Sequence, residues 1–77
     1  MEDSARRGGD NALRVLQEGI KILPAEGILY EHLGMRLRRR GDMKRAADIF
    51  RRGLRAAPGF AKQLHWSLAI VLASTDD

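Results

Sequence analysis

Apolar residues recur at intervals of three and four along most of this chain, which is the period of an amphipathic α-helix. The first such stripe consists of Ala12, Leu16, Gly19, Ile20 and Leu23. Asp10 precedes it, and an aspartate at that position can accept hydrogen bonds from the free amides of a first helical turn. Pro24 ends it, since the residue before a proline is disfavoured in helical geometry. The pattern predicts a helix over about residues 11–23, after a flexible tail over residues 1–10.

Three further segments carry the same period, and they predict helices over about residues 25–40, 43–57 and 60–73, with a short tail over 74–77. The second helix is expected to bury Leu29, Tyr30, Leu33 and Leu37. Gly41 and Asp42 follow it, as a left-handed C-cap and as an N-cap for the next helix. Because all the predicted elements are helices, the predicted fold class is all-α. The short connections predict that consecutive helices are antiparallel neighbours.

The third and fourth predicted helices differ in how their apolar residues are distributed. The third has one apolar face, made of Met43, Ala46, Ala47, Phe50, Gly53 and Leu54. Its opposite face carries Lys44, Asp48, Arg51 and Arg55 and should be wet. The fourth is apolar nearly all round, through Leu64, Trp66, Leu68, Ala69, Ile70, Val71 and Leu72. One neighbouring helix cannot cover all of them, so we expect something outside the chain to do so.

The sequence also repeats itself. A shift of 34 residues places Ala12 on Ala46, Val15 on Ile49, Leu16 on Phe50, Gly19 on Gly53, Ile20 on Leu54 and Pro24 on Pro58. A shift of 35 places Leu29 on Leu64, Leu33 on Leu68, Gly34 on Ala69 and Leu37 on Leu72. Periods of this length are typical of stacked helical hairpins.

Between Tyr30 and Pro58 the chain resembles the tetratricopeptide repeat family, and it is similar to the half-a-TPR class as well. The pattern consists of Tyr30, Leu33-Gly34, Leu37, Gly41-Asp42, Ala46, Phe50 and Pro58. The resemblance implies an α-solenoid with one complete repeat over about residues 27–60, flanked by two half repeats within a domain over 11–73. It also implies that Gly34 lies opposite the small residues Ala46, Ala47 and Gly53.

In that family the first helix of each hairpin lines a concave groove that holds a partner, so the resemblance implies a scaffold for protein–protein interaction. The residues expected to bind a peptide or helix here are Ile28, Glu31, Met35, Arg38, Trp66 and Ile70. A second interpretation of Trp66 and Ile70 stays open, in which they pack against a further repeat or a second copy. We also expect self-association. The chain begins with the second helix of one hairpin and ends with the first helix of another, so the last helix of one copy could pack against the first helix of the next.

Charge adds an alternative function. Between Arg36 and Arg55 there are nine Lys or Arg residues and two Asp residues, a net charge of +7, in a chain whose total is +4. The alternative site, which would bind RNA or another polyanion, consists of six arginines from this stretch: Arg36, Arg38, Arg39, Arg40, Arg51 and Arg55. The other interpretation is a solvated helix face, since only Tyr30 and Trp66 could stack on bases and neither lies in the basic stretch.

The composition favours a binding protein over an enzyme. His32 and His65 have no second ligand or nucleophile at useful spacing, and there is no cysteine, so we expect no metal, cofactor or catalytic site. No apolar run approaches the roughly 18 residues of a membrane span. The first ten residues lack the apolar core of a secretory signal. A cytoplasmic protein without a membrane partner is therefore expected.

Overall fold

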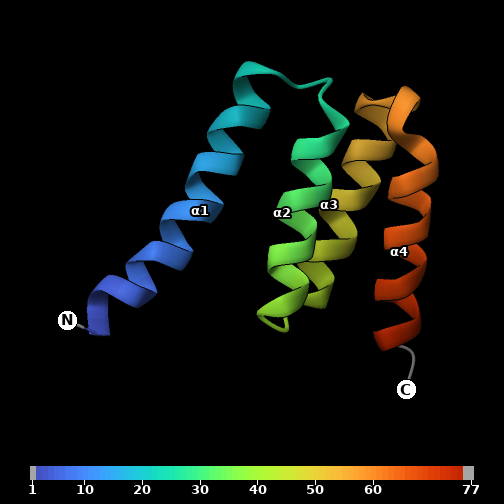
Figure 1. The fold of residues 1–77 in the computed structure, drawn as a ribbon. Helices are drawn as coiled ribbons and strands as arrows, with labels where there is room; N and C mark the ends of the chain where they lie inside the picture. Colours follow the sequence, from blue (N-terminus) through green and yellow to red (C-terminus); the bar gives the residue numbers. More distant parts are fainter. Residues whose placement is uncertain (1, 76–77) are drawn as a thin grey trace.

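The computed structural model describes residues 2–75, which form four α-helices and one short 3-10 helix (Figure 1). The elements are α1 (Glu2–Ile22), α2 (Gly27–Arg39), α3 (Met43–Ala56), η1 (Pro58–Phe60) and α4 (Ala61–Thr75). Consecutive α-helices run in opposite directions, and the described residues contain no strand. The predicted all-α fold with four helices is confirmed, and the predicted bounds of the last three lie within two residues of the observed ones.

Helix α1 departs from the prediction at its start. It begins at Glu2, so the segment predicted as a tail is helical, and Asp10 lies inside the helix where it cannot act as an N-cap. Gly8 and Gly9 disfavour a helix by about 1 kcal/mol each relative to alanine. Unlike proline, however, they keep their backbone N–H groups and do not interrupt the hydrogen-bond ladder. At the other end, residues 74 and 75 belong to α4, and 76–77 lie outside the described residues.

The turn between α2 and α3 forms as its sequence predicts. Gly41 has φ of +87°, which is the left-handed conformation that glycine adopts without steric penalty. The amide of Gly41 donates to the Arg38 carbonyl and that of Asp42 to the Leu37 carbonyl, both at 2.9 Å. This is the paired bonding of a Schellman C-cap. The Asp42 carboxylate then accepts from the Arg45 amide at 3.4 Å, which confirms it as the N-cap of α3.

Helices α2 and α3 interlock through aromatic rings that lie against glycines. The Phe50 ring of α3 lies so close to Gly34 of α2 that a Cβ added there would stand 2.5 Å from Cζ. In the reverse direction, a Cβ at Gly53 of α3 would stand 2.7 Å from Cβ of Tyr30 on α2. The space left by the missing Gly34 side chain is thus filled by the Phe50 ring, which the prediction of small residues opposite Gly34 did not include.

The buried core is centred on α2 and α3. Its buried members are Ile20, Tyr30, Leu33, Leu37, Ala46, Ala47, Ile49, Phe50, Leu64 and Val71. Leu29 is only half-buried and Leu23, predicted in the first apolar stripe, is exposed beyond the end of α1. Ile49, which the predicted face of α3 left out, is buried. The Tyr30 hydroxyl donates to the Pro24 carbonyl at 2.7 Å, which ties the α1–α2 connection to the core.

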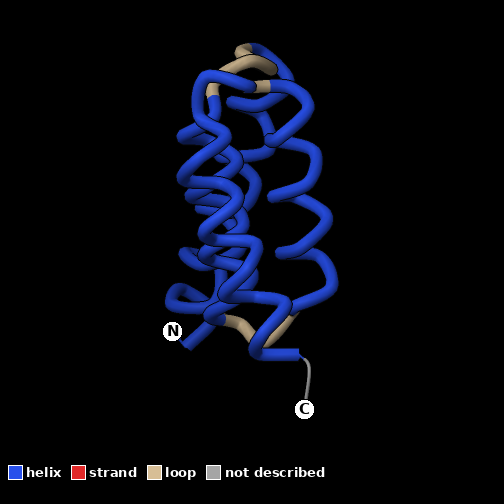
Figure 2. The backbone as a smooth tube through the Cα atoms, turned by 90° about the vertical axis from the view of Figure 1, so that its right-hand side faces the viewer, coloured by secondary structure: helices blue, strands red, loops and turns tan. Residues whose placement is uncertain are grey.

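The helices form a thin array measuring 40 × 36 × 14 Å, with the connecting loops at its two ends (Figure 2). Helix α1 contacts α2 near their connection and diverges from it toward the N-terminus (Figure 1). Over the described residues no Cα of α1 comes within 8 Å of α3. Helix α4 lies against α3 and also contacts α2. One recess lies between α2 and α4, and another lies between α1 and α3.

Candidate interaction surfaces

A groove of about 250 Å³ lies between α2 and α4, and we call it the α2–α4 groove. It is lined by Glu31, Met35, Arg38, Phe50, Trp66, Ser67 and Ile70. The spacing of 31, 35 and 38 places those side chains on one face of α2, and 66 and 70 stand one turn apart on α4. Phe50 reaches the groove from α3 although its residue is fully buried. The groove therefore has an aromatic floor and apolar walls.

The apolar walls of this groove are unusually open to water. The Trp66 residue is 71% exposed and Met35 is 41% exposed, and Ile70 is also exposed. Tryptophan is enriched among the residues that contribute most to binding interfaces, and a flexible methionine side chain adapts to irregular partners. Glu31 and Arg38 add one charge of each sign to the α2 wall. Together these features suit a partner with both apolar and charged side chains.

Five of the six residues predicted to bind a partner line this groove. Ile28 does not line it, although it is 44% exposed, because it lies in the first turn of α2, nearly a full turn before Glu31. The prediction missed Phe50 and Ser67. Phe50 was assigned to the core by its apolar period, and it is indeed buried. The signal that it also reaches the groove is Gly34, whose missing side chain leaves room for the ring between α2 and α3.

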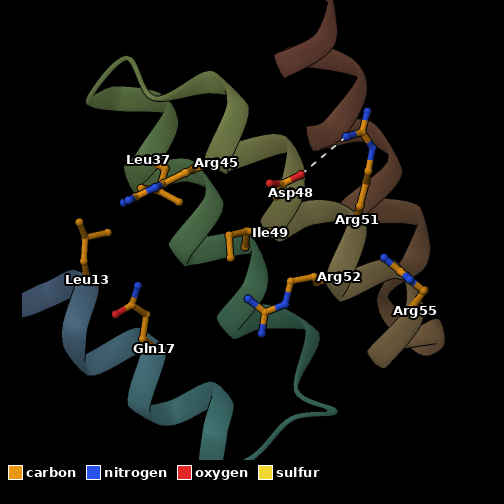
Figure 3. A pocket seen from close by; sticks show the side chains of 9 residues that line it. All are labelled: Leu13, Gln17, Leu37, Arg45, Asp48, Ile49, Arg51, Arg52 and Arg55. Atoms are coloured by element: carbon orange, nitrogen blue, oxygen red, sulfur yellow. Dashed lines mark ion pairs between the residues drawn. The ribbon is translucent and has the colours of Figure 1, made fainter.

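The second recess, the α1–α3 cleft, has a volume of about 510 Å³ (Figure 3). Its lining residues are Leu13, Gln17, Leu37, Arg45, Asp48, Ile49, Arg51, Arg52 and Arg55. In Figure 3, Leu13 and Gln17 project from α1 into the space between α1 and the other two helices, and the Arg52 side chain extends from α3 toward Gln17. A further cavity of about 240 Å³ shares Gln17, Ile49 and Arg52 with it, so the cleft continues along α1 toward Lys21.

The arginines of the α1–α3 cleft are only partly neutralised. Arg45 pairs with Asp42 at 3.6 Å and Arg51 with Asp48 at 3.9 Å. All four side chains are exposed, so each pair contributes about 0–1 kcal/mol. Arg52 and Arg55 form no ion pair with any side chain in the described part of the chain. The cleft wall on α3 therefore carries an excess of positive charge.

The six arginines of the alternative polyanion site do not form one surface. Arg36 and Arg39 line a small cavity with His32, Arg38 lines the α2–α4 groove, and Arg51 and Arg55 line the α1–α3 cleft. Arg40 is the C-cap residue of α2. Successive helical residues differ by about 100° in direction, so a dense run of arginines spreads around a helix. The structure instead groups Arg51 and Arg55 with Arg45 and Arg52, which the predicted site omitted.

Within residues 2–75 no three His, Cys, Asp or Glu side chains lie close enough to hold a metal ion. None of the helices described is long and apolar enough to cross a bilayer. Comparison with protein-family models, with curated proteins and with solved structures finds no match to this chain. The two recesses are therefore interpreted from their own residues.

Proposed function

We propose that this chain is a helical-repeat module of tetratricopeptide type that binds a peptide or helix of another protein in the α2–α4 groove. The observation that carries the proposal is the exposure of Trp66, at 71%, on the wall of a groove whose floor is Phe50. A large exposed aromatic ring beside other apolar side chains marks interaction sites on soluble proteins.

The residue types around the groove indicate what kind of partner fits. Met35 and Ile70 lie with Trp66 on its walls, so apolar side chains spaced like those on one helix face can enter it. Glu31 and Arg38 stand two turns apart on α2, which favours a partner with a basic group near one end and an acidic group near the other. An amphipathic helix or an extended peptide with that pattern is the proposed ligand.

Self-association is the second part of the proposal. Exposed apolar side chains occur on both outer helices, with Val15 and Ile22 on α1 and Trp66 and Ile70 on α4. Ile22 is 74% exposed. If α4 of one copy packs on α1 of the next, both sets become buried, and the association either closes into a dimer or continues as an open stack.

Trp66 is the only tryptophan in the chain, so its fluorescence tests the proposal directly. Helical peptides selected from a displayed library against the folded protein should shift its emission to shorter wavelength as they bury the ring. The Ile70→Glu variant, which places a charge on the same wall, should lose the selected peptides. Selected peptides that leave Trp66 emission unchanged and still bind Ile70→Glu would show that the groove is not the binding site.

A further inference from the structure

We infer that the α1–α3 cleft is a second binding site, and that its ligand is an acidic amphipathic segment of a partner protein. This site is separate from the α2–α4 groove, because the two recesses share no lining residue. The inference therefore does not depend on the function proposed for that groove. Its support comes from the floor of the cleft, the charge of its wall and the residue types that it lacks.

The floor of the cleft is apolar. Leu37 of α2 and Ile49 of α3 line it, and Leu13 of α1 faces them. Leu33 and Ile20 continue the apolar lining into the adjoining cavity. A volume of about 510 Å³ is within the range of about 300–1,000 Å³ that ligand pockets usually have. Leu37 and Ile49 are largely buried at the base of the cleft and Leu13 is half-buried at its side, so apolar side chains of a partner that enter the cleft would contact all three.

The wall of the cleft on α3 selects for negative charge. Four of the nine lining residues are arginines, and Asp48 is the only acidic one. Arg52, which forms no ion pair in the described chain, projects toward Gln17 across the opening (Figure 3). A guanidinium group presents a planar fork of donors that matches a carboxylate. Glutamate or aspartate side chains flanking a partner's apolar residues would therefore meet the arginines as those residues reach the floor.

The same residues argue against a nucleic acid as the ligand. Neither cavity of the cleft is lined by a phenylalanine, tyrosine or tryptophan. Bases bound as single strands gain much of their affinity by stacking on such rings. A phosphate backbone would also meet the arginines but would make no apolar contact with the residues at the base of the cleft. A peptide with acidic and apolar side chains uses both parts of the cleft, and a strand of RNA uses only one.

The test compares a pair of charge-reversed variants on two surfaces. The probe is a fluorescein-labelled helical peptide of about 16 residues, with leucines along one face and glutamates beside them. Arg52→Glu/Arg55→Glu should weaken its binding by about tenfold or more, measured by fluorescence anisotropy. The matched control Arg36→Glu/Arg39→Glu changes the net charge equally on another surface, and its effect should stay within about twofold. A peptide with lysines in place of glutamates should not bind.

A milder variant keeps the test valid if the double charge reversal unfolds the chain, which circular dichroism would reveal. Gln17→Glu places a carboxylate opposite Arg52 without adding bulk, and it should weaken the acidic peptide by a few fold. Three results would overturn the inference: equal losses in both double variants, no binding of the acidic peptide, or tighter binding of an oligouridine of about 20 nucleotides that Arg52→Glu/Arg55→Glu abolishes. A crosslinking result that places a second copy of the chain over Leu13 and Ile49 would also overturn the inference.

Discussion

The ring of Phe50 lies against the Cα of Gly34, and a Cβ added to Gly34 would stand 2.5 Å from Cζ and 2.9 Å from Cδ1 of that ring. Phe50 is fully buried, so a side chain added at Gly34 would have to displace a packed ring. This contact sets the separation of α2 and α3, and it holds the ring that forms the floor of the α2–α4 groove. The fold and the proposed binding site therefore depend on the same pair of residues.

Replacing this glycine should weaken the fold. Gly34→Ala gains helix propensity of about 1 kcal/mol, but overpacking a filled core typically costs about 1–3 kcal/mol. Because the added Cβ would stand less than 3.0 Å from a fully buried ring, the cost should lie in the upper part of that range, and we expect a net loss of about 1–2 kcal/mol in the free energy of unfolding, measured by urea denaturation. Gly59→Ala is the control, since nothing lies within 4 Å of a Cβ there. Equal stability of Gly34→Ala and wild type would contradict the packing described.

Gly41 should be required for a different reason, namely its backbone conformation. Its φ of +87° is unfavourable for residues with a Cβ, while the space around it is open. Gly41→Ala should therefore lower the free energy of unfolding by about 1 kcal/mol through strain alone. Gly41→Asn should cost less, because asparagine tolerates the left-handed region. The comparison is a pair of thermal melts, and an alanine variant as stable as the asparagine variant would refute the explanation.

The Tyr30 hydroxyl should contribute measurably to stability. It donates to the Pro24 carbonyl at 2.7 Å, in a part-buried position. Tyr30→Phe removes this bond and keeps the ring that lies on Gly53, so we expect a loss of about 0.5–1.5 kcal/mol in the free energy of unfolding. Hydrogen exchange should also become faster in the α1–α2 connection. Unchanged exchange there would mean that the bond does not hold the connection to the core.

Two substitutions in helix α4 should have different effects, one on the stability of the fold and the other on self-association. Leu64 is fully buried, and Leu64→Ala should cost about 2–5 kcal/mol in the free energy of unfolding. Trp66 is two residues away and mostly exposed, so Trp66→Ala should change stability by no more than about 0.5 kcal/mol. Sedimentation velocity should show that Trp66→Ala reduces self-association. A large loss of stability in Trp66→Ala would instead place its ring in the core.

The positions of α2, α3 and α4 could be predicted because each apolar period begins or ends at a residue with a specific backbone preference. Gly41 and Asp42 fix the α2–α3 turn, and Pro58 interrupts the helical pattern after α3. The start of α1 could not be placed in this way, since Asp10 has the residue type of an N-cap but lies within a continuous helix. A capping residue permits a helix to start and does not force it to.

The surfaces were harder to predict than the elements. Residues on one helix face follow from the period, so Glu31, Met35 and Arg38 were grouped correctly. The α1–α3 cleft depends on how far α1 diverges from α3, which is a tertiary property that no local pattern encodes. Arg52 and Gln17 meet there from segments 35 positions apart in sequence. For the same reason the arginine run suggested one basic patch, whereas the helices divide it among three surfaces.

The most direct test of the central claim is the affinity of library-selected helical peptides for the wild type compared with a Trp66→Ala/Ile70→Glu variant, measured by isothermal titration calorimetry. We predict saturable binding to the wild type and a loss of at least about tenfold in the variant, since a central aromatic residue often contributes 2 kcal/mol or more to an interface. Equal affinity for both proteins, with the variant still folded by circular dichroism, would contradict the assignment of the α2–α4 groove as the binding site.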